Sequence, residues 1–162
     1  MKKQVVPLKY IPKRLSRRDR ALAAKELKKS RRLYKSGVYH TRKRIKSYPK
    51  KTSPHILKAR RVYKVEKVLP SRELARRSGC SLAALKAIVR KGEGAYFSSG
   101  SRPSQTGHSW GYARLGSAIT GGKSAVVDFH IIEKGCKRSG KAYKLALKAK
   151  GVKRRHTRKT KI

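Results

Sequence analysis

Four leucines at roughly helical spacing predict one helix near the start of the chain: Leu15, Leu22, Leu27 and Leu33. Ser16, with Asp19 three residues later, resembles a capping box at the start of this helix. We expect the helix to run to about Tyr34 and to stop at Gly37, because glycine readily adopts the left-handed conformation that ends helices. The apolar stripe is thin, so this helix needs a partner to bury it.

A second group of apolar positions follows Ser53 and fits one face of a helix: Ile56, Leu57, Ala59, Val62 and Tyr63. Another helix begins after Pro70, with Ser71 as its N-cap. Before the first of these two helices lies the stretch VYHTRKRIKSYPKKTSP (residues 38–54), which has two prolines and no helical periodicity. We interpret it as a basic linker or extended arm.

Residues 71–91 have the spacing of a helix-turn-helix. The contacts between its two helices would come from four residues: Leu74, Ala75, Leu85 and Ile88. Gly79 can take the left-handed conformation at the turn, and Ser81 would cap the second helix.

Five residues of that second helix would face outward: Ala83, Ala84, Lys86, Ala87 and Arg90. None of them is Asn or Gln, and only Lys86 and Arg90 can reach a base or a phosphate. Such a helix binds the nucleic-acid backbone but reads little sequence. We favour a structural helical hairpin and keep a groove-binding element as the alternative.

Residues 92–136 form a module rich in glycine and aromatic residues. Its glycines and Pro103 predict a loop before Ser109, which would cap a helix that ends at Gly121. The β-branched run AVVDFHII (residues 125–132) predicts a short strand. The expected fold class is mainly α: a small helical module with a Gly/Ser-rich loop and a short strand, flanked by extended cationic arms.

The charge of the chain is distributed unevenly. The chain carries 47 Lys and Arg against 7 Asp and Glu, a formal net charge of +40. Residues 1–91 contribute +27, residues 92–134 contribute +1 and residues 135–162 contribute +12. Charge and periodicity together predict three parts: a basic N-terminal arm with one helix (1–52), a folded core (53–136) and a basic C-terminal tail (137–162).

Such a charge favours a polyanionic partner, because self-repulsion destabilises the compact state of the protein alone. Nucleic acid is the first candidate, with DNA favoured and contacts that are largely independent of sequence. Acidic proteins and anionic membrane surfaces would attract the same side chains. A membrane contact would be peripheral, because no apolar run is long enough to span a bilayer. The expected contacts are Arg14, Arg17, Arg18, Arg42, Lys43, Arg44, Lys86, Arg90, Arg154, Arg155 and Arg158. Tyr34, Tyr39 and Tyr48 lie among them in the sequence and can stack or pack.

Five aromatic residues lie where lysine is rare: Tyr96, Phe97, Trp110, Tyr112 and Phe129. Burying such a ring contributes about 1.5 to 3 kcal/mol, whereas burying an unpaired lysine is costly. Within residues 92–122 the only Lys or Arg residues are Arg102 and Arg114. Each is either a buried organiser that donates to loop carbonyls, which we favour, or an anion contact beside the Gly-rich backbone.

The sequence gives little support to an enzyme. TGGKS (residues 120–124) is not a phosphate loop, because Ser117 stands where that motif requires its first glycine. A metal or hydrolytic site can be drawn from three residues: His108, Asp128 and His130. With seven acidic residues in the chain, little is left for paired-carboxylate or two-metal chemistry. We interpret His130 as a structural residue.

Cys80 and Cys136 are too few for a disulfide framework, and we expect both to be reduced. Their spacing is not diagnostic of a zinc site either. We therefore expect no catalytic residue, no metal and no cofactor.

The segment GAYFSSGSRPSQTGHSWGYARL, with the later TGG and VDFHI, resembles a family of small, very basic proteins of large eukaryotic DNA viruses and some phages. The motif residues are Gly94, Tyr96, Arg102, Pro103, Trp110, Arg114 and Asp128. The resemblance implies the context of a virus particle or of virus replication. Together with the charge, this context leads us to expect a non-enzymatic structural protein of the virion, either a minor capsid protein or a capsid-associated core protein. Its partners would be nucleic acid and other capsid proteins, and it would assemble in the host cytoplasm or nucleus. The alternative is a helix-turn-helix DNA-binding regulator.

Overall fold

The computed structural model describes residues 3–162, which divide into two compact units. Unit 1 combines three segments of the chain: the N-terminal residues to Lys51, residues 94–107 and residues 154–162. Unit 2 combines residues 52–93 with residues 108–153. Helices dominate, so the predicted mainly α fold class is confirmed.

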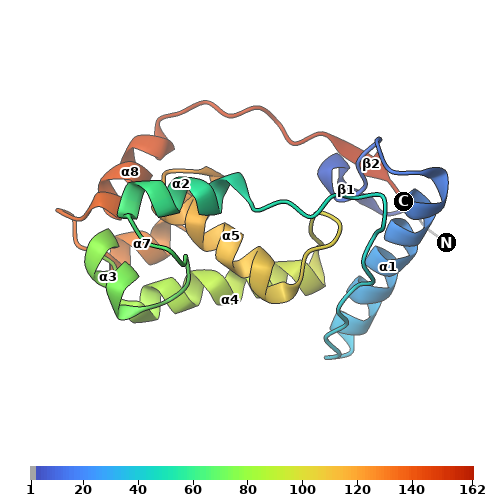
Figure 1. Ribbon diagram of the computed structural model, residues 1–162, viewed down its shortest axis with the longest axis horizontal. Coiled ribbons are helices and arrows are strands. Elements are labelled where there is room, and N and C mark those ends of the chain that lie inside the picture. Colours follow the sequence, from blue (N-terminus) through green and yellow to red (C-terminus); the bar gives the residue numbers. More distant parts are fainter. Residues whose placement is uncertain (1–2) are drawn as a thin grey trace. The chain divides into compact units, whose positions relative to one another are not determined.

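Unit 1 contains two short strands, β1 (Val5–Pro7) and β2 (Lys159–Lys161), which pair antiparallel (Figure 1). In this pairing Val5 lies opposite Lys161 and Pro7 lies opposite Lys159. A 3-10 helix (Leu8–Tyr10) follows β1, and the long helix α1 (Arg17–Lys35) comes next. The β1–β2 pair joins the two ends of the sequence in one folded unit.

Helix α1 begins and ends where the sequence predicts. The Ser16 hydroxyl accepts the Asp19 N–H at 3.1 Å, as an N-cap does. At the other end Gly37 has a φ of +74°, and its N–H donates to the Tyr34 carbonyl at 3.0 Å. These contacts confirm both predicted ends, and the glycine permits the left-handed turn that closes the helix.

Unit 2 is built from α2 (Pro54–Tyr63), α3 (Arg72–Ser78), α4 (Leu82–Ser98), α5 (Gly107–Ile119), α6 (Lys123–Val127), α7 (Phe129–Gly135) and α8 (Lys141–Lys150). The last residues of α4 and the first residue of α5 belong to unit 1. The centre of the unit 2 core is made of fully buried side chains: Leu74, Leu85, Ile88, Leu115, Ile119 and Ile132. No helix within residues 3–162 is long and apolar enough to cross a membrane.

The predicted loop from residue 92 is wrong in its first part, because α4 continues through Gly92 and Gly94 to Ser98. A Cβ placed on Gly92 would lie 2.6 Å from the Cα of Gly111 in α5. Gly92 therefore permits the close approach of two helices and does not break α4. An exposed helix interior would disfavour glycine, but here close packing overrides that propensity.

The predicted strand at residues 125–132 is also wrong, because these residues form α6 and the start of α7. Ala125, Phe129 and Ile132 are buried at helical spacing, so burial against the core overrides the β-branched composition. The strands of the structure lie instead near the two termini.

The observed units also differ from the three predicted parts. Residues 3–51 are not an extended arm, because they pack within unit 1. An apolar cluster of Leu15, Ala23, Ile45 and Tyr48 joins α1 to the segment predicted as a linker. The predicted tail, residues 137–162, contains α8 and β2 and is shared between the units. Residues 92–136 are likewise divided between them.

Candidate functional site

Unit 1 gathers most of the basic residues that the sequence predicts as anion contacts. The Leu8 N–H donates to the Arg158 carbonyl at 2.8 Å, next to the β1–β2 pair. This pairing places cations from both ends of the sequence in one unit: Arg14, Arg17, Arg18, Lys43, Arg44, Arg154, Arg155 and Arg158. All eight are exposed. They form the exposed basic set of unit 1.

Arg14 and Tyr48 form one local contact in this unit. The Arg14 guanidinium carbon lies 4.9 Å from the centre of the Tyr48 ring, and Tyr48 itself is buried. This geometry is a cation–π contact, so Tyr48 packs and is not available to a base. Arg17 and Arg18 lie in the first turn of α1, and both side chains are exposed.

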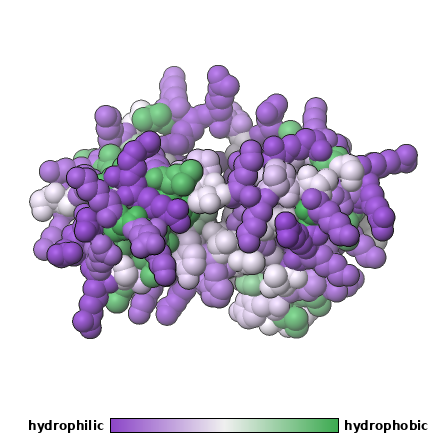
Figure 2. Space-filling model, in the orientation of Figure 1, coloured by the Kyte–Doolittle hydropathy of each residue, from purple (hydrophilic) through white to green (hydrophobic). Residues whose placement is uncertain are grey.

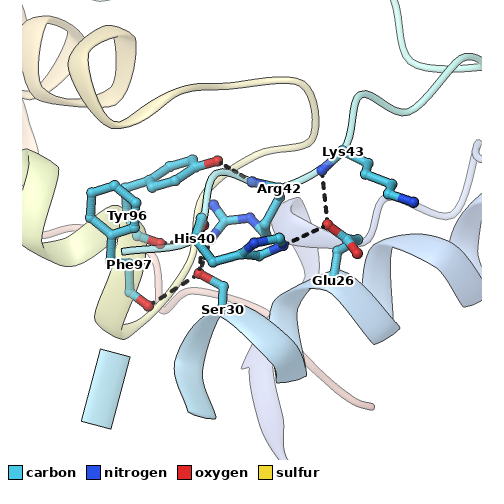
Figure 3. A network of polar contacts seen from close by, with 7 residues as sticks. All are labelled: Glu26, Ser30, His40, Arg42, Lys43, Tyr96 and Phe97. Carbon is cyan, nitrogen blue, oxygen red and sulfur yellow. Dashed lines mark hydrogen bonds and ion pairs between the residues drawn. The ribbon is translucent and has the colours of Figure 1, made fainter. Parts of the chain in front are cut away.

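Arg42 is not a surface contact, so this prediction is wrong. Its guanidinium lies over the Tyr96 ring, 3.8 Å from the centroid. It donates to the Tyr96 carbonyl at 2.7 Å and to the Ser30 hydroxyl at 3.1 Å (Figure 3). It also donates to the Ser101 hydroxyl at 2.6 Å. Burial lowers the pKa of Arg42 from its ordinary value. Arginine remains charged at any physiological pH, so this half-buried side chain joins three segments of unit 1 as a cation.

Glu26 lies beside Arg42 in the same network. Its Oε2 accepts the Lys43 N–H at 2.9 Å and lies 3.0 Å from Nε2 of His40 (Figure 3). Burial opposes ionisation of Glu26, but the hydrogen bonds from Lys43 and His40 outweigh it and lower the pKa of the carboxyl from 4.5. The carboxylate therefore holds the chain from His40 to Lys43 against α1.

This network has the residue types of a hydrolytic site without its geometry. The Ser30 hydroxyl is fully buried, lies 3.4 Å from the carbonyls of His40 and Phe97, and accepts from Arg42. A nucleophilic serine would instead donate to a histidine ring nitrogen. The adjoining pocket, lined by Glu26, Arg42 and Ser101 among others, has a volume of about 20 Å³. That is room for about one water molecule.

Arg102 and Arg114 have different environments. Arg102 is exposed, which rules out the buried role favoured for it, although its neighbour Pro103 is buried. Arg114 donates to both oxygens of Asp128, at 2.7 and 2.8 Å, and Lys91 Nζ lies 3.1 Å from the same carboxylate. Arg114 is thus an organiser, but its partner is a carboxylate and not a loop carbonyl.

Asp128 is fully buried between α6 and α7. Burial opposes its ionisation, but the hydrogen bonds and positive charge of Arg114, and then of Lys91, outweigh it and lower the pKa from 3.8.

The motif residues contribute largely to the interiors of the two units. Tyr96 is fully buried in unit 1, Trp110 is half-buried in unit 2, and Gly94 lies within α4.

The helical hairpin forms as predicted. Ser71 accepts the Leu74 N–H at 3.1 Å, Gly79 has a φ of +79°, and Ser81 accepts the Ala84 N–H at 3.1 Å. Lys86 and Arg90 are exposed on α4, whereas Ala84, predicted to face outward, is buried. A Cβ placed on Gly135 would lie 2.4 Å from the Ala84 Cβ, so the end of α7 packs against the first turn of α4.

Two of the three residues considered for a metal site have other partners, and the third is exposed. Nδ1 of His108 lies 2.7 Å from Oε1 of Glu93, Asp128 pairs with Arg114, and His130 is exposed. Within residues 3–162 no three His, Cys, Asp or Glu side chains gather in a way that could hold a metal ion.

The prediction of two reduced cysteines is wrong, because Cys80 and Cys136 form a disulfide. The Ser81 N–H donates to the Gly135 carbonyl at 2.7 Å, and the Lys137 N–H donates to the Gly79 carbonyl at 2.8 Å. These two backbone hydrogen bonds bring together cysteines that are 56 residues apart in the sequence. A separation of that size leaves no local signal in the sequence.

Sequence reasoning missed the roles of Glu26 and Ser30, although a signal for them exists. Ala23, Glu26, Leu27 and Ser30 recur at i, i+3, i+4 and i+7, the spacing of one helix face. All four are buried in α1. A glutamate on an apolar face requires partners, and here they are His40 and the Lys43 backbone.

The comparisons with known proteins give one match. A model of a family of unknown function, DUF5824, matches residues 7–134, well over half of the chain. No curated protein and no solved structure matches the chain. The matched range begins in β1 and reaches α7, and it includes both the Arg42 network and the Asp128 ion pairs. The chain belongs to the DUF5824 family, for which no function is known.

Proposed function

We propose that this protein is a non-enzymatic nucleic-acid-binding protein of a virus particle, a minor capsid or capsid-associated protein that holds phosphate backbones through its basic surface. The observation that carries this proposal is the net charge of +40 together with the positions of the seven acidic residues. Five of them contact partners within the fold: Asp19, Glu26, Glu73, Glu93 and Asp128. A polyanion from outside is therefore needed to neutralise the surface.

The surface supports this proposal. Hydrophilic side chains dominate the face shown in Figure 2, and only small hydrophobic patches interrupt them. The exposed basic set of unit 1 is presented by a folded scaffold and not by loose arms, so its side chains lose less freedom on binding. Contacts of this kind recognise phosphate and carry no sequence information.

The virion context rests on the motif resemblance, and the disulfide supports it. Disulfides persist in oxidising surroundings, which include the surfaces of virions, and are rare in the cytosol. A bond between Cys80 and Cys136 fits a particle protein better than a cytosolic regulator.

The first test is the salt dependence of binding to a random-sequence duplex. We expect the association constant to fall at least about a thousandfold between 50 and 200 mM salt, because several phosphates exchange condensed counterions for Lys and Arg. Fluorescence anisotropy with labelled DNA measures it. Replacing Arg17, Arg18, Lys43 and Arg44 with glutamine should reduce the slope of log K against log salt by about 3 to 4.

The matched control is the variant E66Q/E133Q, which removes two exposed carboxylates and should bind no more weakly than the wild type. Binding that is weak at 50 mM salt, or that does not respond to salt, would reject the nucleic-acid proposal. For the particle, graded salt extraction should release the protein together with the genome. Retention in the emptied shell would assign the charge to capsid contacts, and absence from particles would remove the virion context.

The hairpin supports one alternative function, a helix-turn-helix regulator, because Lys86 and Arg90 are exposed on its second helix. The base-reading residues of such a motif lie at the start of that helix. Here the first turn of α4 packs against Gly135, and the exposed residue in it is Ala83. The geometry therefore favours backbone contact over base reading.

Replacing Lys86 and Arg90 with alanine separates these functions. We expect affinity to fall by about three- to tenfold for every duplex, because two phosphate contacts are lost and no base contact. Competition between a selected binding sequence and random DNA measures the discrimination between them. A regulator would instead lose its preference for the selected sequence, which would move this alternative to first place.

A further inference from the structure

Two tyrosines of unit 1 expose their rings side by side. Tyr34 is 36 % exposed and Tyr39 is 68 % exposed, and their ring centroids lie 6.0 Å apart at an angle of 65°. Val38, beside Tyr39 in the sequence, is also exposed. Large apolar groups gathered at a charged surface mark an interaction site more often than isolated ones do.

The exposed pair rests on further aromatic rings. Phe97 packs against Tyr39 edge to face, with centroids 5.2 Å apart, and Tyr96 packs against Phe97 in the same way at 4.9 Å. Tyr96 is in turn fully buried beneath Arg42. The four rings thus form a chain of edge-to-face contacts that runs from the interior of unit 1 to its surface.

The backbone on both sides of Tyr39 is fixed. The Val38 N–H donates to the Leu33 carbonyl at 3.0 Å, in the turn that closes α1. On the other side, the His40 ring contacts Glu26, and the Ser30 hydroxyl contacts the His40 carbonyl (Figure 3). A ring held in place in this way loses little conformational entropy when a ligand packs on it.

The surroundings of the pair are cationic. The sequence contains no acidic residue between Glu26 and Glu66. The last two turns of α1 carry Arg31, Arg32 and Lys35, and Tyr34 lies among them. A ligand for this surface must combine negative charge with flat apolar faces. Single-stranded nucleic acid has both, whereas a duplex hides its base faces.

We propose that the platform formed by Tyr34 and Tyr39 stacks unpaired bases of single-stranded nucleic acid, while the cations of α1 hold the adjoining phosphates. This inference rests on the proposed function and narrows its ligand to a strand with accessible bases. Tyr48 has no such role, because it is buried under Arg14.

The test compares Tyr39→Ala with the wild type on three ligands at one salt concentration: a single-stranded oligonucleotide, the same strand with abasic sites, and the matching duplex. We expect the variant to bind the single strand about tenfold more weakly, because one stacked base is lost. Affinity for the duplex and for the abasic strand should change less than twofold. Tyr39→Phe should bind as the wild type does, since it keeps the ring, and circular dichroism should show that Tyr39→Ala is folded.

Each outcome supports or overturns one statement. Wild-type preference for the single strand over the abasic strand, lost in Tyr39→Ala, supports the platform. If Tyr39→Ala binds the single strand as tightly as the wild type does, while duplex binding remains salt-dependent, the platform is refuted and the proposed function stands. Equal weakening on all three ligands also refutes base stacking. If the wild type binds none of them at low salt, the proposed function fails and the platform fails with it.

Discussion

Replacing Asp128 with asparagine is expected to lower the free energy of unfolding of unit 2 by about 3 kcal/mol. The carboxylate is fully buried and accepts two hydrogen bonds from Arg114 and one contact from Lys91. Asparagine keeps the size but removes the charge, so two cations face each other without an anion. Lys91 is 41 % exposed and can turn back to water, whereas Arg114 is mostly buried and cannot. The expected loss of stability therefore lies at the lower end of the range for a broken buried ion pair.

The effect of Asp128 should depend on pH in a defined direction. Its pKa in the folded protein lies below the ordinary value of 3.8, so the unfolded state binds the proton first as pH falls. The stabilisation is fully present well above pH 3.8 and is lost as pH falls through the folded pKa. The difference between wild type and variant should thus be constant from pH 7 to pH 5 and should shrink below pH 4.

Guanidinium unfolding followed by tryptophan fluorescence measures this effect, since the only tryptophan, Trp110, lies in unit 2. Glu133→Gln on α7 is the matched control: it removes an exposed carboxylate and should change stability by less than about 0.5 kcal/mol. In a double-mutant cycle, the variant with both Arg114→Gln and Asp128→Asn should lose less stability than the sum of the losses in the two single variants. Additive costs would show that the two side chains are not coupled.

The elements that the sequence predicts correctly depend on contacts between near neighbours. Ser16 caps α1 through Asp19, three residues away, and Ser71 caps α3 through Leu74. Gly37 and Gly79 both take the left-handed conformation at helix ends, because no side chain opposes it. Such signals lie within one turn of helix and can be recognised without the fold.

The elements predicted wrongly depend on partners that are far away in the sequence. Gly92 has the same local appearance as a loop glycine, and its role in a helix follows only from the approach of Gly111. Likewise, nothing near Arg42 distinguishes it from Arg44. Its burial depends on Tyr96 and Ser101, more than fifty residues later.

In the candidate site, too, some features can be predicted from the sequence alone and others depend on the fold. Composition alone predicts an anionic partner, because charge does not depend on how the chain folds. Which cations are exposed depends on the fold: Arg42, expected at the surface, is half-buried, and Arg102, expected to be buried, is exposed. Tyr34, Tyr39 and Tyr48 are equivalent in the sequence, and only their packing separates an exposed pair from a buried ring.

The disulfide between Cys80 and Cys136 is expected to contribute about 4 kcal/mol to the stability of the protein. Closing a loop of this length restricts the unfolded chain, and the loss of chain entropy increases with the logarithm of loop size. Here the cysteines are 56 residues apart, and the loop contains α4, α5, α6 and α7. The bond therefore restricts most of the helices of unit 2.

The double variant C80A/C136A should unfold at a correspondingly lower guanidinium concentration than the wild type. Alanine is the suitable replacement, because both sites are buried and serine would bury unpaired hydroxyls. A reductant should destabilise the wild type by the same amount and leave the variant unchanged, which separates loss of the bond from loss of packing. Two titratable thiols in the native, non-reduced protein would show that the bond is absent. In that case the backbone hydrogen bonds of Ser81 and Lys137 alone would hold the ends of α3 and α7 together.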